Sequence, residues 1–235
     1  MCWSCKWCFA KMTTPRIKAF GFDLDKTLYP PHPEIDMRIR EYLCLDVVTR
    51  LSGRDHDEVH EEFYRNLEKS GSGSRTVAKM LSIGREEARP YVDQAQAEAN
   101  IVDILKRDPK LVGLLKLIKD ACPTFLITSS DEEMALRKLE ALGVRRHSAI
   151  FSMCFYAGSE YAREDGSAFR YVSEKLNVPF PEMIFVGDRE GVDIVPANRL
   201  GIKTARVHIK PDEETVADYR LETIYELRRF LPMIG

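Results

Sequence analysis

Short apolar runs alternate with helical patterns through the C-terminal half of the chain, and this alternation strongly constrains the fold. Runs of this length and character are typical of fully buried strands. Strands separated by helices of about ten residues predict a Rossmann-like, doubly wound α/β fold, with a parallel sheet covered on both faces. The predicted strands are residues 16–23, Thr124–Thr128, Ala149–Phe151, Met183–Val186 and Thr204–Val207; the predicted helices are Asp108–Ala121, Asp131–Leu142, Ser167–Leu176, Val192–Leu200 and Leu221–Leu231.

Between the first two predicted strands, residues 31–107 show only helical spacing. Right-handed crossovers place the carboxyl ends of all parallel strands at one edge of the sheet, where ligands bind in such folds. We therefore expect a core from residues 16–30 and 108–235, with 31–107 as an all-helical cap above that edge. Residues 1–15 join no pattern and are expected to be an N-terminal extension. Within the cap, the Gly/Ser-rich stretch Ser70–Ser74 predicts a flexible joint.

Composition and charge exclude several classes of protein. The 235 residues include 35 basic and 37 acidic side chains, a net charge of −2, which gives no reason to expect nucleic acid as a partner. No run approaches the roughly 18 apolar residues of a membrane span, and no signal peptide is evident. Six dispersed cysteines do not resemble a disulfide scaffold, so we expect a cytoplasmic protein. The basic bias of residues 1–18 leaves a transit peptide as the alternative.

Two carboxylates and a hydroxyl follow the first predicted strand, in the sequence Asp23-Leu24-Asp25-Lys26-Thr27. Asp23 and Asp25 point the same way if the chain stays extended, and two anions at that spacing repel each other. A hard divalent cation with oxygen ligands would relieve the repulsion, and Mg²⁺ is the expected intracellular choice. The alternative is a strand-to-turn junction whose polar side chains satisfy only backbone groups.

Polar residues also follow two other predicted strands. Met183–Val186 is followed by Gly187-Asp188, with Asp193 five residues later at a helix start. Thr128 and Ser129 end the second strand just before a helix N-terminus, where hydroxyls and backbone N–H groups form an anion site. Each group taken alone is also explained by helix capping. Their common place at one sheet edge favours a single site.

In order and spacing these residues resemble the haloacid dehalogenase-like hydrolase superfamily, and the resemblance covers about residues 16–231. The residues that match its first, second and fourth motifs are Asp23, Asp25, Thr27, Thr128, Asp188 and Asp193. The third motif is normally a Lys followed by Pro. Counting back from Asp188 places Arg163 and Glu164 there instead. A guanidinium can still neutralise carboxylate and phosphate charge, and Lys175 is the alternative cation.

The resemblance implies a role for each residue. It makes Asp23 the nucleophile that forms an aspartyl-phosphate, and Asp25 the general acid and then base. It assigns Mg²⁺ to Asp23, Asp188 and the backbone carbonyl of Asp25. Thr128, Ser129 and Arg163 would bind the phosphate oxygens. Thr27 and Asp193 would orient the catalytic and metal-binding groups without contacting the substrate. The second carboxylate favours phosphate over carbon–halogen substrates, since a halide leaving group needs no proton.

The inserted cap resembles the family's commonest helical cap, and Leu28-Tyr29-Pro30 resembles, more loosely, the pyrimidine 5′-nucleotidase-like branch. Such lids favour small metabolites, so the expected substrate is a small phosphate monoester of the nucleotide or sugar phosphate type. Arg75 is the candidate specificity residue of the cap, with a solvated side chain as its alternative. The oligomeric state is not predictable from the sequence.

Two rival functions stay open: a phosphomutase or phosphotransferase of the same fold, and a catalytically silent binding module. Two further patterns have simple explanations. Cys2, Cys5 and Cys8 have metal-ligand spacing but no adjacent fourth ligand, which favours a poorly ordered N-terminal tail over a metal site. His56 and His60 lie four apart on a predicted cap helix without the order of a metalloprotease motif, which favours a solvated helix face.

Overall fold

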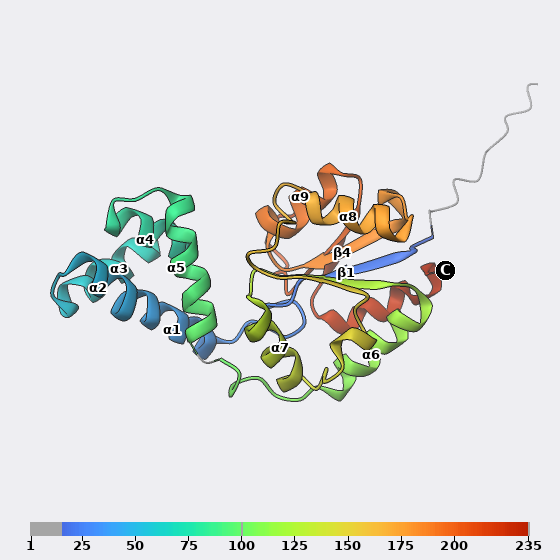
Figure 1. The fold of residues 1–235 in the computed structure, drawn as a ribbon, viewed down its shortest axis with the longest axis horizontal. Helices are drawn as coiled ribbons and strands as arrows, with labels where there is room; N and C mark the ends of the chain where they lie inside the picture. Colours follow the sequence, from blue (N-terminus) through green and yellow to red (C-terminus); the bar gives the residue numbers. More distant parts are fainter. Residues whose placement is uncertain (1–15, 100, 235) are drawn as a thin grey trace, which may run out of the picture.

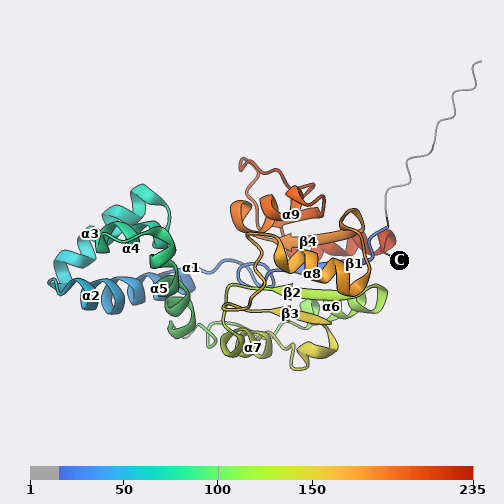
Figure 2. The same cartoon turned by 45° about the horizontal axis from the view of Figure 1, so that its top comes forward.

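The computed structural model describes residues 16–99 and 101–234, so the cysteines at 2, 5 and 8 lie outside the described residues. It contains a sheet with helices on both faces and a separate group of helices beside it (Figure 1). The two parts are joined by the segment that follows the first strand and by the segment that precedes helix α6, Pro109–Ala121 (Figures 1 and 2). Within the described ranges, no helix is both long and apolar enough to span a bilayer.

The sheet has six parallel strands in the order β3-β2-β1-β4-β5-β6. This arrangement confirms the predicted doubly wound α/β fold. Strands β1, β2 and β4 are buried at every position, which explains why all their residues except Thr124 are apolar or glycine. The strands are β1 Ala19–Phe22, β2 Thr124–Ile127, β3 Met153–Phe155, β4 Met183–Gly187, β5 Lys203–Val207 and β6 Tyr219–Leu221.

Alternate side chains of β1, β2 and β4 enter two separate apolar cores. Phe22 and Val186 face the layer that contains α6 (Pro109–Ala121) and α7 (Glu132–Ala141). Phe125 and Phe185 face the layer that contains α8 (Ser167–Leu176) and α9 (Val195–Arg199). The two helix layers lie on opposite faces of the sheet (Figure 1). Period-two alternation with both faces apolar therefore positions the strands between the layers.

The inserted helices form a unit with its own apolar core, in which Phe63 and Val77 are fully buried. A π-helical turn, Leu43–Thr49, continues α1 into α2. The helices of this cap are α1 Pro33–Tyr42, α2 Arg50–Ser52, α3 His56–Ser70, α4 Gly73–Leu81 and α5 Arg85–Glu98. The predicted flexible joint at Ser70–Ser74 is instead a tight turn. Gly71 ends α3 in the left-handed conformation, and the Ser72 side chain caps α4.

Two predicted elements differ from the structure. The predicted strand Ala149–Phe151 is instead the last residue of a 3₁₀ turn, His147–Ala149, and the start of the loop after it. The edge strand is β3, which pairs with β2 through Met153 and Phe125. Ile150 and Phe151 are buried in the core without joining the sheet, so burial alone produced a strand-like pattern. The predicted closing helix is instead β6 followed by a 3₁₀ helix, Ile224–Met233, whose N-terminus Thr223 and Glu226 cap reciprocally.

The cysteines and histidines outside residues 1–15 show no ligand cluster. Cys44, Cys122 and Cys154 are free. His56 contacts Asp57 and His60 contacts Glu41 on partly exposed surfaces of the cap. Of the residues that the structure describes, only Asp23, Asp188 and Asp193 form a group of three potential metal ligands.

Candidate active site

Asp23 lies at the carboxyl end of β1 and is almost fully buried. Its backbone N–H donates to the carbonyl of Val186 in β4, at 2.9 Å, which holds the chain in sheet register at this point. The chain then turns, with Lys26 in the left-handed region, so that the Thr27 hydroxyl returns to Asp23 Oδ2 at 3.0 Å. The turn therefore fixes the rotation of the carboxylate and leaves Oδ1 toward the centre of the site.

Arg163 occupies that centre. Its guanidinium is 2% exposed, and Nη1 donates to Asp23 Oδ1 at 2.5 Å and to Asp193 Oδ1 at 2.6 Å. Nη2 donates to the Ser129 hydroxyl at 2.6 Å. Burial alone would lower the pKa of Arg163, but the two carboxylates raise it above its ordinary value. The predicted Arg-for-Lys replacement thus places a permanent charge between both carboxylates.

Asp193 is fully buried, and each of its carboxylate oxygens accepts a hydrogen bond. Oδ1 accepts from Arg163, and Oδ2 accepts from the backbone N–H of Arg189 at 2.9 Å. This geometry requires glycine at position 187, because a Cβ there would lie 2.3 Å from the Asp193 Cβ. Asp193 thus holds the Arg163 guanidinium, and its role in supporting the catalytic groups stays a prediction.

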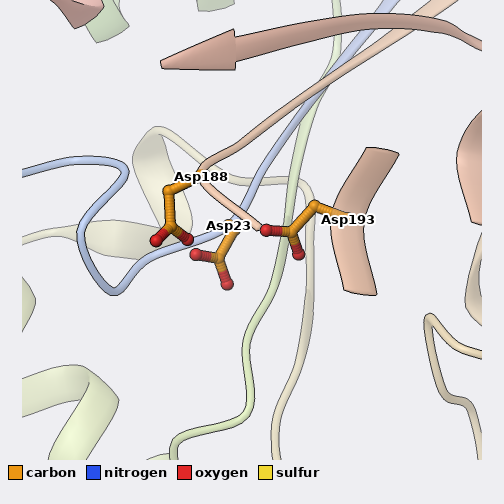
Figure 3. A group of neighbouring side chains, drawn as sticks. All are labelled: Asp23, Asp188 and Asp193. Atoms are coloured by element: carbon orange, nitrogen blue, oxygen red, sulfur yellow. The ribbon is translucent and has the colours of Figure 1, made fainter. Parts of the chain in front are cut away.

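The side chains of Asp23, Asp188 and Asp193 point toward one another (Figure 3), with one oxygen from each within 4.8 Å of the others. Burial raises the pKa of Asp23 to about 6, against the opposing charge of Arg163. Burial, Asp23 and Asp193 raise the pKa of Asp188 to about 8. Asp188 Oδ1 is buried and finds no hydrogen-bond donor within the described part of the chain.

These features fit a cation. A buried carboxylate oxygen without a donor is costly unless a proton or a metal ion occupies it. Oxygen ligands of this kind suit Mg²⁺. Asp23 and Asp193 each accept two hydrogen bonds, so the donor-free Oδ1 of Asp188 is the carboxylate oxygen with the most room for a metal ion.

Asp25 is held away from this cluster by four donors. Oδ1 accepts from Tyr29 and from Lys138, each at 2.6 Å; Oδ2 accepts from Ser130 at 2.7 Å and from Thr128 at 3.4 Å. Burial by itself would raise the pKa of Asp25. The charge and hydrogen bond of Lys138, with the bonds from Tyr29 and Ser130, outweigh burial and lower the pKa to about 2.

Neither Lys138 nor Ser130 was predicted from the sequence as a site residue. Lys138 is on the buried face of α7 with Met134, Ala135 and Leu139. A lysine within an apolar helical stripe was the available signal, because such a residue must find an anion or a set of acceptors in the interior.

The side chains predicted to bind phosphate already form hydrogen bonds within the protein. The Ser129 hydroxyl accepts from Arg163 and, at 3.2 Å, from Arg189. The Thr128 hydroxyl donates to Asp25 and accepts from the backbone N–H of Ser130. Asp131 caps the α7 N-terminus with its own side chain. The structure therefore brings Ser129 and Arg163 together beside Asp23, whereas Thr128 contacts Asp25 instead. Arg189 is a second cation at Ser129 that was not predicted.

Between cap and core there is a cavity of about 220 Å³ next to Asp25. Its walls include Asp25, Tyr29 and Lys138 from the core and Ile39, Leu43 and Val92 from the cap. Elsewhere along the cleft, Arg89 of α5 forms an ion pair with Glu164 of the core at 2.5 Å.

The structure does not bring Arg75 or Lys175 to the site. Arg75 is exposed, and its guanidinium donates to the Ser70 carbonyl within its own turn. Lys175 is also exposed, and its ammonium lies over the ring of Tyr171.

Comparison with known proteins finds similar sequences and folds. A glyceraldehyde 3-phosphate phosphatase of Methanopyrus kandleri is 26% identical over 236 residues, which cover 90% of this chain and 95% of that protein. A HAD phosphatase from Thermococcus onnurineus has a similar fold, with a TM-score of 0.61 and 22% identity over 92% of this chain and 98% of that one. A putative beta-phosphoglucomutase from Thermotoga maritima has a TM-score of 0.58 and 18% identity, covering 93% and 100%.

The model of the haloacid dehalogenase-like hydrolase family matches residues 17–201, which include all of Asp23, Arg163, Asp188 and Asp193. On that match over most of its length, the chain belongs to the haloacid dehalogenase-like hydrolases.

Proposed function

We propose that this phosphoric monoester hydrolase is Mg²⁺-dependent and cleaves a small phosphorylated metabolite through an aspartyl-phosphate on Asp23. The observation that carries the proposal is the environment of Asp23. Its carboxylate lies between the Arg163 guanidinium and the donor-free oxygen of Asp188, so a cationic side chain and an oxygen that can bind a metal ion flank one nucleophile. A buried carboxylate in such surroundings suits nucleophilic attack on phosphorus.

In the first step a bond forms between an Asp23 oxygen and phosphorus as the bond from phosphorus to the leaving oxygen breaks. Asp25 gives a proton to the leaving oxygen. In the second step water attacks phosphorus, Asp25 takes its proton, and Asp23 is released as a carboxylate with inorganic phosphate. Arg163 and Ser129, which are joined by a hydrogen bond of 2.6 Å, would bind the phosphoryl oxygens.

Asp23, Asp188 and the backbone carbonyl of Asp25 would hold Mg²⁺, which supplies positive charge for the phosphoryl oxygens. The substrate class also belongs to this proposal. A cavity of about 220 Å³ under the cap suits a small leaving group such as a sugar or nucleoside. A 26% identical relative is a phosphatase of a triose phosphate, which supports the sugar phosphate alternative. The free cysteines support a cytoplasmic location.

The test is hydrolysis of 4-nitrophenyl phosphate with and without Mg²⁺, beside the Asp23→Asn variant. We expect turnover to need the metal and to vanish in the variant. Metal-independent turnover, or activity that survives Asp23→Asn, contradicts the mechanism. Measuring free phosphate separates a hydrolase from a phosphotransferase of the same fold, and a panel of metabolite phosphates that includes glyceraldehyde 3-phosphate tests the substrate class.

A further inference from the structure

Lys138 is a completely buried lysine that the mechanism above does not use. It lies on α7, and the mechanism uses residues of the loop before this helix but none of the helix itself. A lysine ammonium in the interior is costly unless it is paired and hydrogen-bonded. Here it donates to Asp25 Oδ1 at 2.6 Å and to the Ser130 hydroxyl at 2.8 Å.

Ser130 closes a triangle with these two residues. Its hydroxyl accepts from Lys138 and donates to Asp25 Oδ2 at 2.7 Å. Each Asp25 oxygen thereby receives a donor from the loop after β2 or from α7, and Tyr29 adds a second donor to Oδ1. Contacts on both oxygens from separate elements fix the rotation as well as the position of the carboxylate.

The held carboxylate also faces the cleft. Asp25, Lys138 and Tyr29 all contribute to the cavity between core and cap, whose other wall is formed by apolar cap residues such as Ile39 and Leu43. Asp23 and Asp188 belong to the metal-binding cluster. The two carboxylates of the motif therefore serve different parts of the site, with Asp25 on the side of the cap cavity.

We propose that Lys138 is a positioning residue, which with Ser130 holds the Asp25 carboxylate at the cavity where the leaving group departs. The inference rests on the proposed function, because it concerns the proton given to that group. When the bond from phosphorus to the leaving oxygen breaks, the Asp25 proton forms the new O–H bond, and Asp25 remains as an anion. Lys138 donates to Oδ1 directly and reaches Oδ2 through Ser130, so it keeps the carboxylate that transfers this proton in one orientation, and its contribution is greatest for leaving groups that need the proton.

The experiment compares Lys138→Met with the unaltered protein on two substrates. Methionine keeps the length and apolar stem of the side chain and removes the ammonium that holds Asp25 and Ser130. An alkyl phosphate such as glycerol 3-phosphate leaves as a basic alkoxide unless protonated, whereas 4-nitrophenolate leaves without a proton. We expect kcat/KM for the alkyl ester to fall by about 10-fold to 100-fold more than that for the aryl ester. An equal loss on both substrates, or no loss, would overturn the proposal.

A second variant keeps the test valid if Lys138→Met fails to fold. Ser130→Ala removes one corner of the triangle without stranding a charge. It should shift the alkyl-to-aryl ratio in the same direction by about threefold or more, on the scale of one lost hydrogen bond. An unchanged ratio in folded Ser130→Ala contradicts the proposal.

The matched control is Lys175→Met, the same substitution at an exposed position of α8. It should leave the alkyl-to-aryl ratio unchanged. Failure of the proposed function is recognised separately, because activity would then survive Asp23→Asn on both substrates. If Asp23→Asn is inactive and Lys138→Met keeps the ratio, only the inference about Lys138 is overturned.

Discussion

Arg163 Nη1 lies 2.5 Å from Asp23 Oδ1, so the nucleophilic carboxylate is held directly by a guanidinium. The same guanidinium contacts Asp193 and Ser129. A lysine has one nitrogen at the end of a flexible stem and cannot match a planar fork that meets three partners at once. The replacement of lysine by arginine in this chain therefore joins the nucleophile, its support and a phosphate-binding hydroxyl into one rigid group.

Substitutions at Arg163 should separate charge from geometry. Arg163→Lys retains the charge but gives up the contact to Ser129, so we expect kcat/KM to fall by about 10-fold. Arg163→Met leaves two buried carboxylates without a cation and should reduce the free energy of unfolding by about 3–5 kcal/mol. Urea unfolding near neutral pH measures this loss. If Arg163→Met were as stable as Arg163→Lys, the charge would have no role in holding the site.

Gly187→Ala should disturb the site without changing any charge. The added Cβ would lie 2.3 Å from the Asp193 Cβ, so Asp193 must move and take Arg163 with it. We expect a destabilisation of about 1–3 kcal/mol and a fall in kcat of about 100-fold. Thermal unfolding and steady-state kinetics measure the two effects.

The control is Gly113→Ala on α6, where an added Cβ meets no atom within 4 Å. It should leave kcat unchanged and raise stability by about 0.5–1 kcal/mol, because alanine favours a helix. Equal kinetics for the two variants would show that the close approach at Gly187 does not constrain Asp193.

The sequence predicted the parts of the site that depend on the sheet. Asp23 and Asp188 follow apolar strands, and parallel topology brings strand ends to one edge whatever the loops do. Arg163 was located through its spacing from Asp188 and the family resemblance. Lys138 was not predicted, because helical periodicity identifies the buried face of α7 but not which residue of another segment lies opposite.

The errors in the predicted fold have a similar cause. Ile150 and Phe151 are as buried as strand residues, yet the edge strand forms two residues later, where backbone groups meet β2. The tight turn at Ser70–Ser74 depends on Gly71 and Ser72 acting as helix caps, which Gly/Ser composition alone does not distinguish from a flexible joint. Side-chain polarity indicates burial but not backbone pairing.

Stability should depend on pH and Mg²⁺ together. Burial raises the pKa values of Asp23 to about 6 and Asp188 to about 8, so the metal-free folded state binds more protons than the unfolded chain from about pH 4 to 8. Its stability should fall as pH rises through that window. The lowered pKa of Asp25 acts in the opposite direction, and only below about pH 4.

Mg²⁺ competes with these protons, so the rise in Tm with excess Mg²⁺ should be larger near pH 8 than near pH 5. Differential scanning fluorimetry at both pH values tests this. Asp188→Asn removes one carboxylate and should abolish most of the rise at the higher pH. A rise in Tm that is independent of pH would contradict the assignment of these carboxylates to the metal.

The cap should contribute to substrate binding through Arg89 rather than through Arg75, although both arginines are exposed on cap helices. Arg89 reaches across the cleft to Glu164 at 2.5 Å, whereas Arg75 donates to Ser70 in its own turn. An ion pair this exposed is worth at most about 1 kcal/mol, so Arg89→Ala should raise KM by about twofold to fivefold, with little change in stability. Arg75→Ala should change KM less than twofold, on the same argument. Steady-state kinetics on one small phosphate ester measures both variants, and added salt should weaken the Arg89 effect. A larger effect at Arg75 would instead support the sequence-based prediction that this residue selects the substrate.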